Sequence, residues 1–150
     1  ILQGGLEAAG EARERLLQRF LLPEPRVALG LALRGLASAC IDVSDGLAGD
    51  LAKLCAASGA GARIESRELP LSPALVAAAG REAAVRHALT GGDDYELLFT
   101  APAGQRGAVG ALTAGVACRR IGTVVAGRGV LVDGAALPRD AGHGFDHFAG

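Results

Sequence analysis

The spacing of apolar residues along the chain changes several times, and each change marks a predicted element. In residues 7–22, leucine and phenylalanine side chains recur at helical intervals among charged ones, which predicts a helix. Pro23 and Pro25 end this run, because proline is incompatible with a helix interior. Residues 26–37 place leucines along one helical face and predict a second helix.

A change from strand to helix is predicted at residues 44–46. Ile41 and Val43 alternate with polar neighbours, which is the period of a strand with one buried face. From Leu47 the apolar residues follow a helical period, and Gly59 is the predicted C-cap. A strand, a tight turn and a helix are therefore expected to meet here.

The rest of the chain alternates short predicted elements without a strict strand–helix–strand repeat. Strands are predicted at residues 62–65, 95–100, 118–125 and 130–132, and helices at residues 73–79, 82–89 and 105–113. Residues 127–129 predict a hairpin turn. This order predicts an α+β fold, in which helices cover a mixed β-sheet.

Composition and charge narrow the class of protein. The formal net charge of −1 removes the usual electrostatic basis for binding nucleic acid or a membrane surface. No apolar run approaches the roughly 20 residues that span a bilayer. Cys40, Cys55 and Cys118 are too widely spaced for a zinc site or a disulfide framework, so we expect a reducing, cytoplasmic location.

The length of 150 residues suits one compact domain with its own core. The sequence contains no methionine, so its start is either processed or internal to a longer chain. Residues 1–10 lack a capped, periodic opening. We therefore expect this chain to be a piece of a larger protein.

The first cluster with chemical potential is Asp42, Ser44 and Asp45. Residues two apart on a strand point the same way, so Asp42 and Ser44 are expected to share a face. Asp45 lies where the chain enters a helix, whose free N–H groups suit phosphate oxygens. Carboxylates beside a phosphate are typical of Mg²⁺ sites. The cluster predicts a nucleotide-phosphate and metal site.

A simpler interpretation is that Ser44 or Asp45 only caps the helix, as such residues commonly do. Asp42 argues against this alternative, because a cap does not require a carboxylate two residues earlier in the strand.

The second cluster covers residues 91–96, Gly-Gly-Asp-Asp-Tyr-Glu. The two glycines allow positive φ or a close approach, and the adjacent acids repel each other unless a cation or donors lie nearby. The alternative is a solvated acidic turn. The positions of the few aromatic residues favour a binding site over a solvated turn. Tyr95 and Phe99 belong to this segment and the strand that follows it, and Phe145 and Phe148 belong to the C-terminal tail. Such surroundings suit a flat, cationic heterocycle.

Several segments together resemble the C-terminal domain of the thiamine-monophosphate kinase family. This family belongs to the aminoimidazole-ribonucleotide synthetase-related superfamily. The resemblance runs from about Pro23 to Phe148, and it implies a two-domain kinase whose N-terminal domain is absent here, with residues 1–22 forming an inter-domain helix region. The segments that carry it, in family order, are residues 41–47 with Asp50, 59–64, 69–72, 91–100, 121–122 and 144–148.

The resemblance implies phosphorylation of thiamine monophosphate to thiamine diphosphate by ATP with Mg²⁺. On matching positions, Asp42 and Asp45 would be Mg²⁺ ligands and Ser44 an ATP contact. Asp93 and Phe145 would contact the thiamine substrate, although the family usually has Glu where this chain has Asp93. No residue is assigned as catalytic.

The resemblance also implies a homodimer, through the N-terminal domain, which supplies further metal ligands. This chain alone is therefore expected to be nearly inactive. Two alternatives stay open, namely a related superfamily enzyme with another acceptor and a non-catalytic binding or assembly module.

Overall fold

Two small β-sheets organise the computed structural model, which describes residues 8–112 and 116–136. Strands β1 (Ala39–Val43) and β3 (Glu96–Thr100) form an antiparallel pair. Ala39 lies opposite Thr100 at one end of the pair, and Val43 lies opposite Glu96 at the other. The pair therefore has two distinct ends, and the acidic segments of the sequence lie at the second.

The other sheet is mixed. Its strands are β4 (Gly122–Val125), β2 (Gly61–Ile64), β5 (Gly129–Val132) and β6 (Ala135–Ala136), in that spatial order. Strand β2 is antiparallel to β4 and parallel to β5. The hairpin predicted at residues 127–129 is therefore wrong, because β2 lies between the two strands that this turn connects.

Five α-helices are assigned in the described residues. Their bounds are α1 (Gly10–Leu21), α2 (Val27–Ala32), α3 (Leu47–Ser58), α4 (Pro73–Thr90) and α5 (Arg106–Gly110), with short 3₁₀ turns at Ser66–Glu68 and Ala103–Gln105. Helix α4 is interrupted at Gly80, which confirms the predicted division. The predicted helices over residues 26–37 and 105–113 are shorter than expected, since α2 gives way to a turn after Ala32 and α5 follows a 3₁₀ turn.

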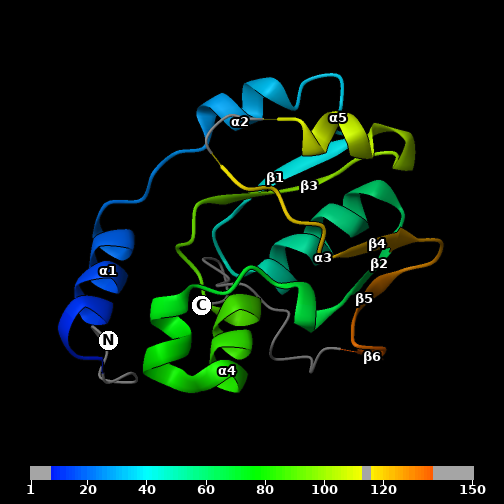
Figure 1. Cartoon of the computed structure of the whole chain (residues 1–150). Coiled ribbons are helices and arrows are strands. Elements are labelled where there is room, and N and C mark those ends of the chain that lie inside the picture. Colours follow the sequence, from blue (N-terminus) through cyan, green and yellow to red (C-terminus); the bar gives the residue numbers. More distant parts are fainter. Residues whose placement is uncertain (1–7, 113–115, 137–150) are drawn as a thin grey trace, which may run out of the picture.

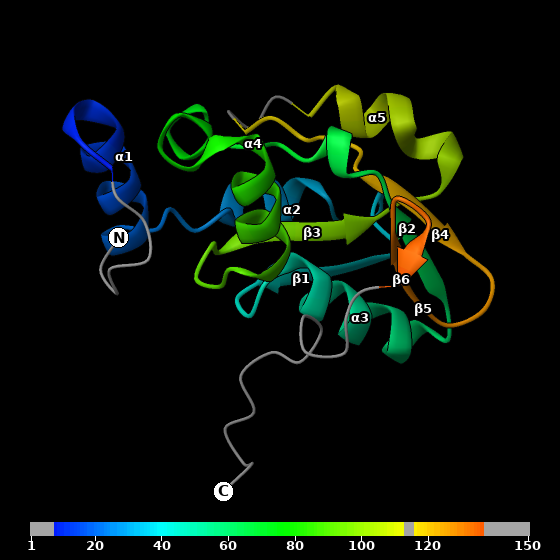
Figure 2. The same ribbon diagram turned by 90° about the horizontal axis from the view of Figure 1, so that it is seen from below.

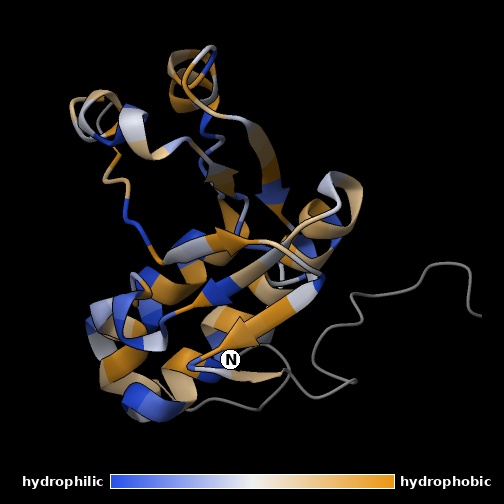
Figure 3. Ribbon diagram, turned by 90° about the vertical axis from the view of Figure 1, so that its right-hand side faces the viewer, coloured by the Kyte–Doolittle hydropathy of each residue, from blue (hydrophilic) through white to orange (hydrophobic). Residues whose placement is uncertain are grey.

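Helix α3 lies at the centre of the core. It contacts β1, β2, β5 and α4, and its Leu51 and Cys55 are buried with Val43, Ile64 and Leu98. Figures 1 and 2 show α3 on one side of the β1–β3 pair and α2 on the other. In Figure 3 the apolar colour follows long stretches of the strands. Because Val43 at the end of β1 and Leu51 in α3 belong to one buried cluster, the start of α3 is held beside the end of β1.

The N-terminal region is much less covered. No residue of α1 is buried, and the helix contacts α4. Several large apolar side chains of α1, α2 and the segment between them stay exposed, namely Phe20, Leu21, Leu22, Val27 and Leu31. We call these five side chains the apolar face. In the described residues, no helix is both long and apolar enough to cross a membrane.

Candidate functional site

The two acidic turns lie side by side at the Val43–Glu96 end of the β1–β3 pair. The backbone N–H of Tyr95 donates to the carbonyl of Val43 at 2.9 Å. Beyond the last strand residues, the N–H of Asp93 donates to the carbonyl of Ser44, also at 2.9 Å. The strand pairing is thereby extended into the turns, and it brings the Asp42–Asp45 segment next to Asp93.

This approach depends on glycine. A Cβ atom on Gly92 would lie 2.6 Å from the carbonyl oxygen of Ser44, well inside van der Waals contact. Gly46 has φ of +109°, and a Cβ there would lie 3.0 Å from the carbonyl carbon of Thr90. Positive φ in the second turn falls on Asp93 (65°) and Tyr95 (51°) rather than on its glycines. The close approach that Gly92 allows is made by the protein's own backbone.

The three residues of the first cluster have different surroundings. Asp42 is exposed on β1, opposite Leu97. Ser44 and Asp45 are partly buried, and the ammonium of Lys53 on α3 forms an ion pair with the Asp45 carboxylate. The pKa of Lys53 is raised, first by its hydrogen bond to Asp45.

The helix-cap alternative is wrong in its simple form. The N-cap of α3 is Gly46, and no side chain caps this helix end. Neither Ser44 nor Asp45 therefore serves as the expected cap, and their side chains are not needed to begin the helix.

Asp50 is the residue whose role the sequence did not reveal. It lies in the first turns of α3 with a side chain only 2% exposed, and it accepts hydrogen bonds from the backbone N–H groups of Ser44 (2.9 Å) and Asp45 (3.0 Å). Lys53 donates to its other oxygen at 3.0 Å. Burial alone would raise the pKa of Asp50, but these donors outweigh burial and hold the pKa below its usual value. The sequence held one sign of this role, because Asp50 is a carboxylate within the apolar stripe of the predicted helix.

The second cluster presents one aromatic ring beside a carboxylate. The Tyr95 hydroxyl donates to Oδ1 of Asp93 at 3.2 Å, and Tyr95 as a residue is 42% exposed. That hydrogen bond, then the charges of Asp93 and Asp42, raise the pKa of Tyr95. The charge of Asp42 adds least to this shift, and it is the backbone hydrogen bond between Asp93 and Ser44 that joins the two clusters.

The pKa values of Asp94 and Glu96 are shifted in opposite directions. Removal of water around Asp94 raises its pKa to about 6 although its side chain reaches the surface, and the charges of Glu96 and Asp93 add to the shift. Glu96 instead accepts two hydrogen bonds from Arg26 (2.7 and 2.8 Å) and one from Arg19 (2.7 Å), which lower its pKa. Glu96 therefore attaches the N-terminal region to β3 and is not free for a ligand.

The predicted ligand residues do not form a complete set of metal ligands within the described residues. Within residues 8–112 and 116–136, no group of three or more His, Cys, Asp or Glu side chains converges as a metal site. Asp42 and Asp45 offer the hard oxygen donors that Mg²⁺ prefers, and such sites are commonly completed by phosphate oxygens and water. Phe145 lies outside the described residues.

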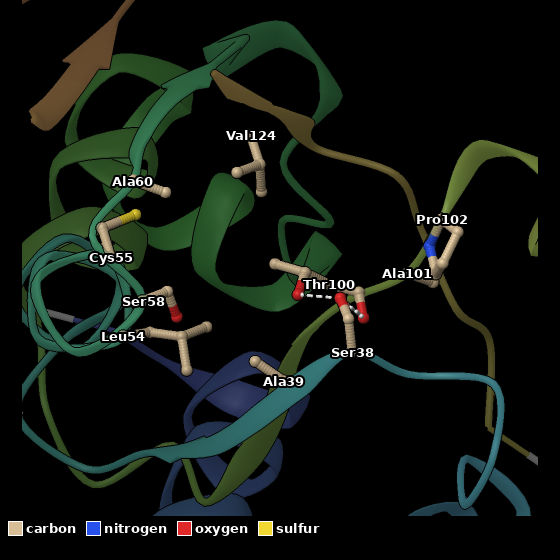
Figure 4. A pocket seen from close by; sticks show the side chains of 10 residues that line it. All are labelled: Ser38, Ala39, Leu54, Cys55, Ser58, Ala60, Thr100, Ala101, Pro102 and Val124. Atoms are coloured by element: carbon tan, nitrogen blue, oxygen red, sulfur yellow. Dashed lines mark hydrogen bonds between the residues drawn. The ribbon is translucent and has the colours of Figure 1, made fainter. Parts of the chain in front are cut away.

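A cavity of about 310 Å³ lies at the opposite end of the β1–β3 pair (Figure 4). The side chains of Leu54, Cys55 and Val124 line it together with the hydroxyls of Ser38 and Thr100, which lie 2.8 Å apart. It has no charged lining residue. Its chemistry does not suit a phosphate or a metal ion, so the acidic turns remain the candidate site.

The close approach at Gly92 is testable by adding one methyl group. We expect Gly92→Ala to destabilise the protein by about 1–3 kcal/mol, because overpacking forces the Ser44 carbonyl away. The free energy of unfolding in urea measures this. Gly104→Ala is the matched control, since its Cβ meets nothing within 4 Å. Equal effects of the two substitutions would show that the turns are not in contact.

The raised pKa of Asp94 predicts a pH dependence of stability. The folded protein holds this proton up to pH of about 6, whereas the unfolded chain loses it near 4, so stability falls as the pH rises between these values. Asp94→Asn should remove this fall in stability. At pH 7 it should raise the free energy of unfolding by about 1 kcal/mol, after allowance for solvent screening. Carboxyl ¹³C shifts and urea unfolding at pH 4.5 and 7 measure both effects, with Glu82→Gln as the control. A titration of Asp94 near pH 4 would contradict the prediction.

Comparisons with known proteins identify related sequences and related structures. The chain is 43% identical to the thiamine-monophosphate kinase of Escherichia coli (strain K12), over 99% of this chain and 47% of that protein. The crystal structure of the thiamine-monophosphate kinase from Stenotrophomonas maltophilia K279a matches at 46% identity with a TM-score of 0.84, over 91% of this chain and 45% of that one. The predicted α+β fold and the resemblance are thereby confirmed.

A third relative was solved with ligands. AaThiL complexed with AMPPCP and TMP matches at 33% identity with a TM-score of 0.79, over 98% of this chain and 45% of that one. The present chain spans about half the length of the relatives it matches. The family profile described as "AIR synthase related protein, C-terminal domain" matches residues 4–134. With most of its length under that profile, the chain belongs to the AIR synthase related protein family as a C-terminal domain.

Proposed function

We propose that this chain is the C-terminal part of a kinase that transfers the γ-phosphoryl group of ATP to thiamine monophosphate. A phosphate oxygen of thiamine monophosphate forms a bond to the γ-phosphorus as the bond to the ADP oxygen breaks, which gives thiamine diphosphate. The observation that carries the proposal is the hydrogen bond between Asp93 N–H and the Ser44 carbonyl. This bond places the Asp42–Asp45 turn, which suits Mg²⁺ and phosphate, next to the Asp93–Tyr95 turn, which suits a cationic ring.

The first turn supplies the phosphate side of the site. Ser44 and Asp45 precede α3, whose first N–H groups carry partial positive charge and favour phosphate oxygens. Asp42 and Asp45 would hold Mg²⁺, which neutralises charge on the phosphates when bound. Lys53 pairs with Asp45 and balances its charge.

The second turn supplies the acceptor side. Thiamine carries a permanent positive charge on a flat thiazolium ring, and such a cation is attracted to an aromatic face and to a carboxylate. Tyr95 exposes its ring beside Asp93, which matches this requirement. Phe145 is proposed as a further contact. Asp93 is one methylene shorter than the usual Glu, so its reach to the substrate is reduced.

The missing half of the kinase supplies the remaining ligands. We propose that an N-terminal domain packs against the apolar face, since its five large apolar side chains are each about half exposed or more and come from one short stretch of the chain. Arg26 and Arg19 hold this region in place through Glu96. The same domain would form the homodimer.

Cys40, Cys55 and Cys118 are all free thiols, which supports the proposed cytoplasmic location.

The test is a kinase assay on the full-length protein. We expect Asp42→Asn and Asp45→Asn each to lower kcat/KM for thiamine diphosphate formation about 100-fold or more, because electrostatic stabilisation of the transferred group is lost. Glu82→Gln, which removes an exposed carboxylate paired with Arg86, should leave the rate unchanged. Activity of both aspartate variants at the level of Glu82→Gln would refute the assignment.

The alternatives give other outcomes in the same assay. Turnover of ATP with another phosphorylated or amide acceptor only would indicate a related superfamily enzyme. Absence of binding of any nucleotide to the intact protein would indicate an assembly module. The 150-residue chain alone should show little turnover, because half of the charged groups that position the phosphates are missing.

A further inference from the structure

We propose that Asp50 is a positioning residue for both acidic turns, because its buried carboxylate sets the orientation of the Ser44–Asp45 peptide. This inference deepens the proposed function and rests on it for the identity of the ligands. The contacts of Asp50 described below all lie within this chain.

The contacts of Asp50 all lead to the first turn or to its charge partner. Oδ2 accepts the N–H groups of Ser44 and Asp45, and Oδ1 accepts the ammonium of Lys53. Lys53 in turn pairs with the Asp45 carboxylate. One buried side chain therefore holds the backbone of Asp45 directly and its carboxylate through a single intermediate.

The orientation of one peptide transmits this control to the second turn. The Ser44 carbonyl and the Asp45 N–H belong to the same peptide unit, and no cis peptide bond occurs in the described residues. In a trans peptide these two groups point in opposite directions. When Asp50 accepts the Asp45 N–H, it turns the Ser44 carbonyl outward, where the Asp93 N–H donates to it.

The position of Asp50 is costly for a residue with a purely packing role. In the described part of the chain it is the one buried polar or charged residue, and it lies in the stripe of α3 that faces the core. A buried charge is strongly unfavourable unless donors compensate it. A leucine would suit core packing better than an aspartate. The carboxylate is therefore explained by the donors that it binds, namely the two N–H groups of the turn and Lys53.

Asp50→Asn tests this role with almost no change in volume. Whichever way the amide is turned, its NH₂ group faces donors, either the two backbone N–H groups or the Lys53 ammonium. The substitution therefore removes acceptor capacity without leaving a cavity. Lys53→Gln separates the two arms, because it removes the ammonium and keeps the bonds to the turn. Glu82→Gln is the matched carboxylate-to-amide control.

Two measurements on the full-length protein are combined. Native-state hydrogen exchange reports the amides of Ser44, Asp45 and Asp93, with the Asp133 amide, which donates to Ile64, as a distant reference. Calorimetry reports the Kd of Mg²⁺ with AMPPCP and, separately, of thiamine monophosphate. A residue with only a structural role would speed exchange at the reference amide as well, through global opening.

In Asp50→Asn we expect the three turn amides to exchange at least about tenfold faster while the Asp133 amide keeps its rate, and Kd for the nucleotide to rise about tenfold. Lys53→Gln should leave the exchange of Ser44 and Asp45 close to that of the unsubstituted protein. The proposal is overturned if turn and reference amides accelerate together, if none accelerates, or if Lys53→Gln reproduces the full effect. If the unsubstituted protein binds neither ligand, the proposed function fails, and the exchange data still decide the role of Asp50.

Discussion

The candidate site depends on the Ser44–Asp45 peptide, whose two polar groups are bonded in opposite directions. On its inner side, the Asp45 N–H donates to the buried Asp50 carboxylate, and on its outer side the Ser44 carbonyl accepts the Asp93 N–H. The lack of a side chain on Gly92 makes the second contact possible. Two segments separated by almost fifty residues of sequence therefore act as one structural unit at the end of a strand pair.

The carboxylates around this unit are neutralised by cationic partners to different extents. Glu96 is fully engaged by Arg26 and Arg19, and Asp50 is engaged by backbone donors and Lys53. Asp42 and Asp93 face solvent without such cationic partners among the described ion pairs. Asp45 lies between these two groups, because it is partly exposed but paired with Lys53. Glu96 and Asp50 hold the scaffold, whereas Asp42 and Asp93 keep their carboxylates open to solvent.

The sequence predicted the elements well where the spacing of apolar residues agreed with the position of a glycine that ends or interrupts a helix. Examples are β1, α3 with its C-cap Gly59, and the division of α4 at Gly80. It failed where the outcome depended on strand order, since nothing local in residues 127–129 indicates that β2 lies between their strands. The motifs and the family resemblance selected Asp42, Ser44, Asp45 and Asp93, and the structure brings their two segments together, while their roles as ligands stay predictions. The function of Asp50 could not be predicted, because it depends on which backbone groups a buried side chain meets in three dimensions. Phe145 stays a prediction.

The central claim is that the two acidic turns form one ligand site. The most direct measurement is a crystal structure of the full-length protein with Mg²⁺, a non-hydrolysable ATP analogue and thiamine monophosphate. The account predicts metal–oxygen distances of about 2.1 Å to Asp42 and Asp45, with the thiazolium ring beside Asp93 and Tyr95. Ligands bound elsewhere, for example in the cavity lined by Ser38 and Thr100, with Asp45 still paired only to Lys53, would contradict it.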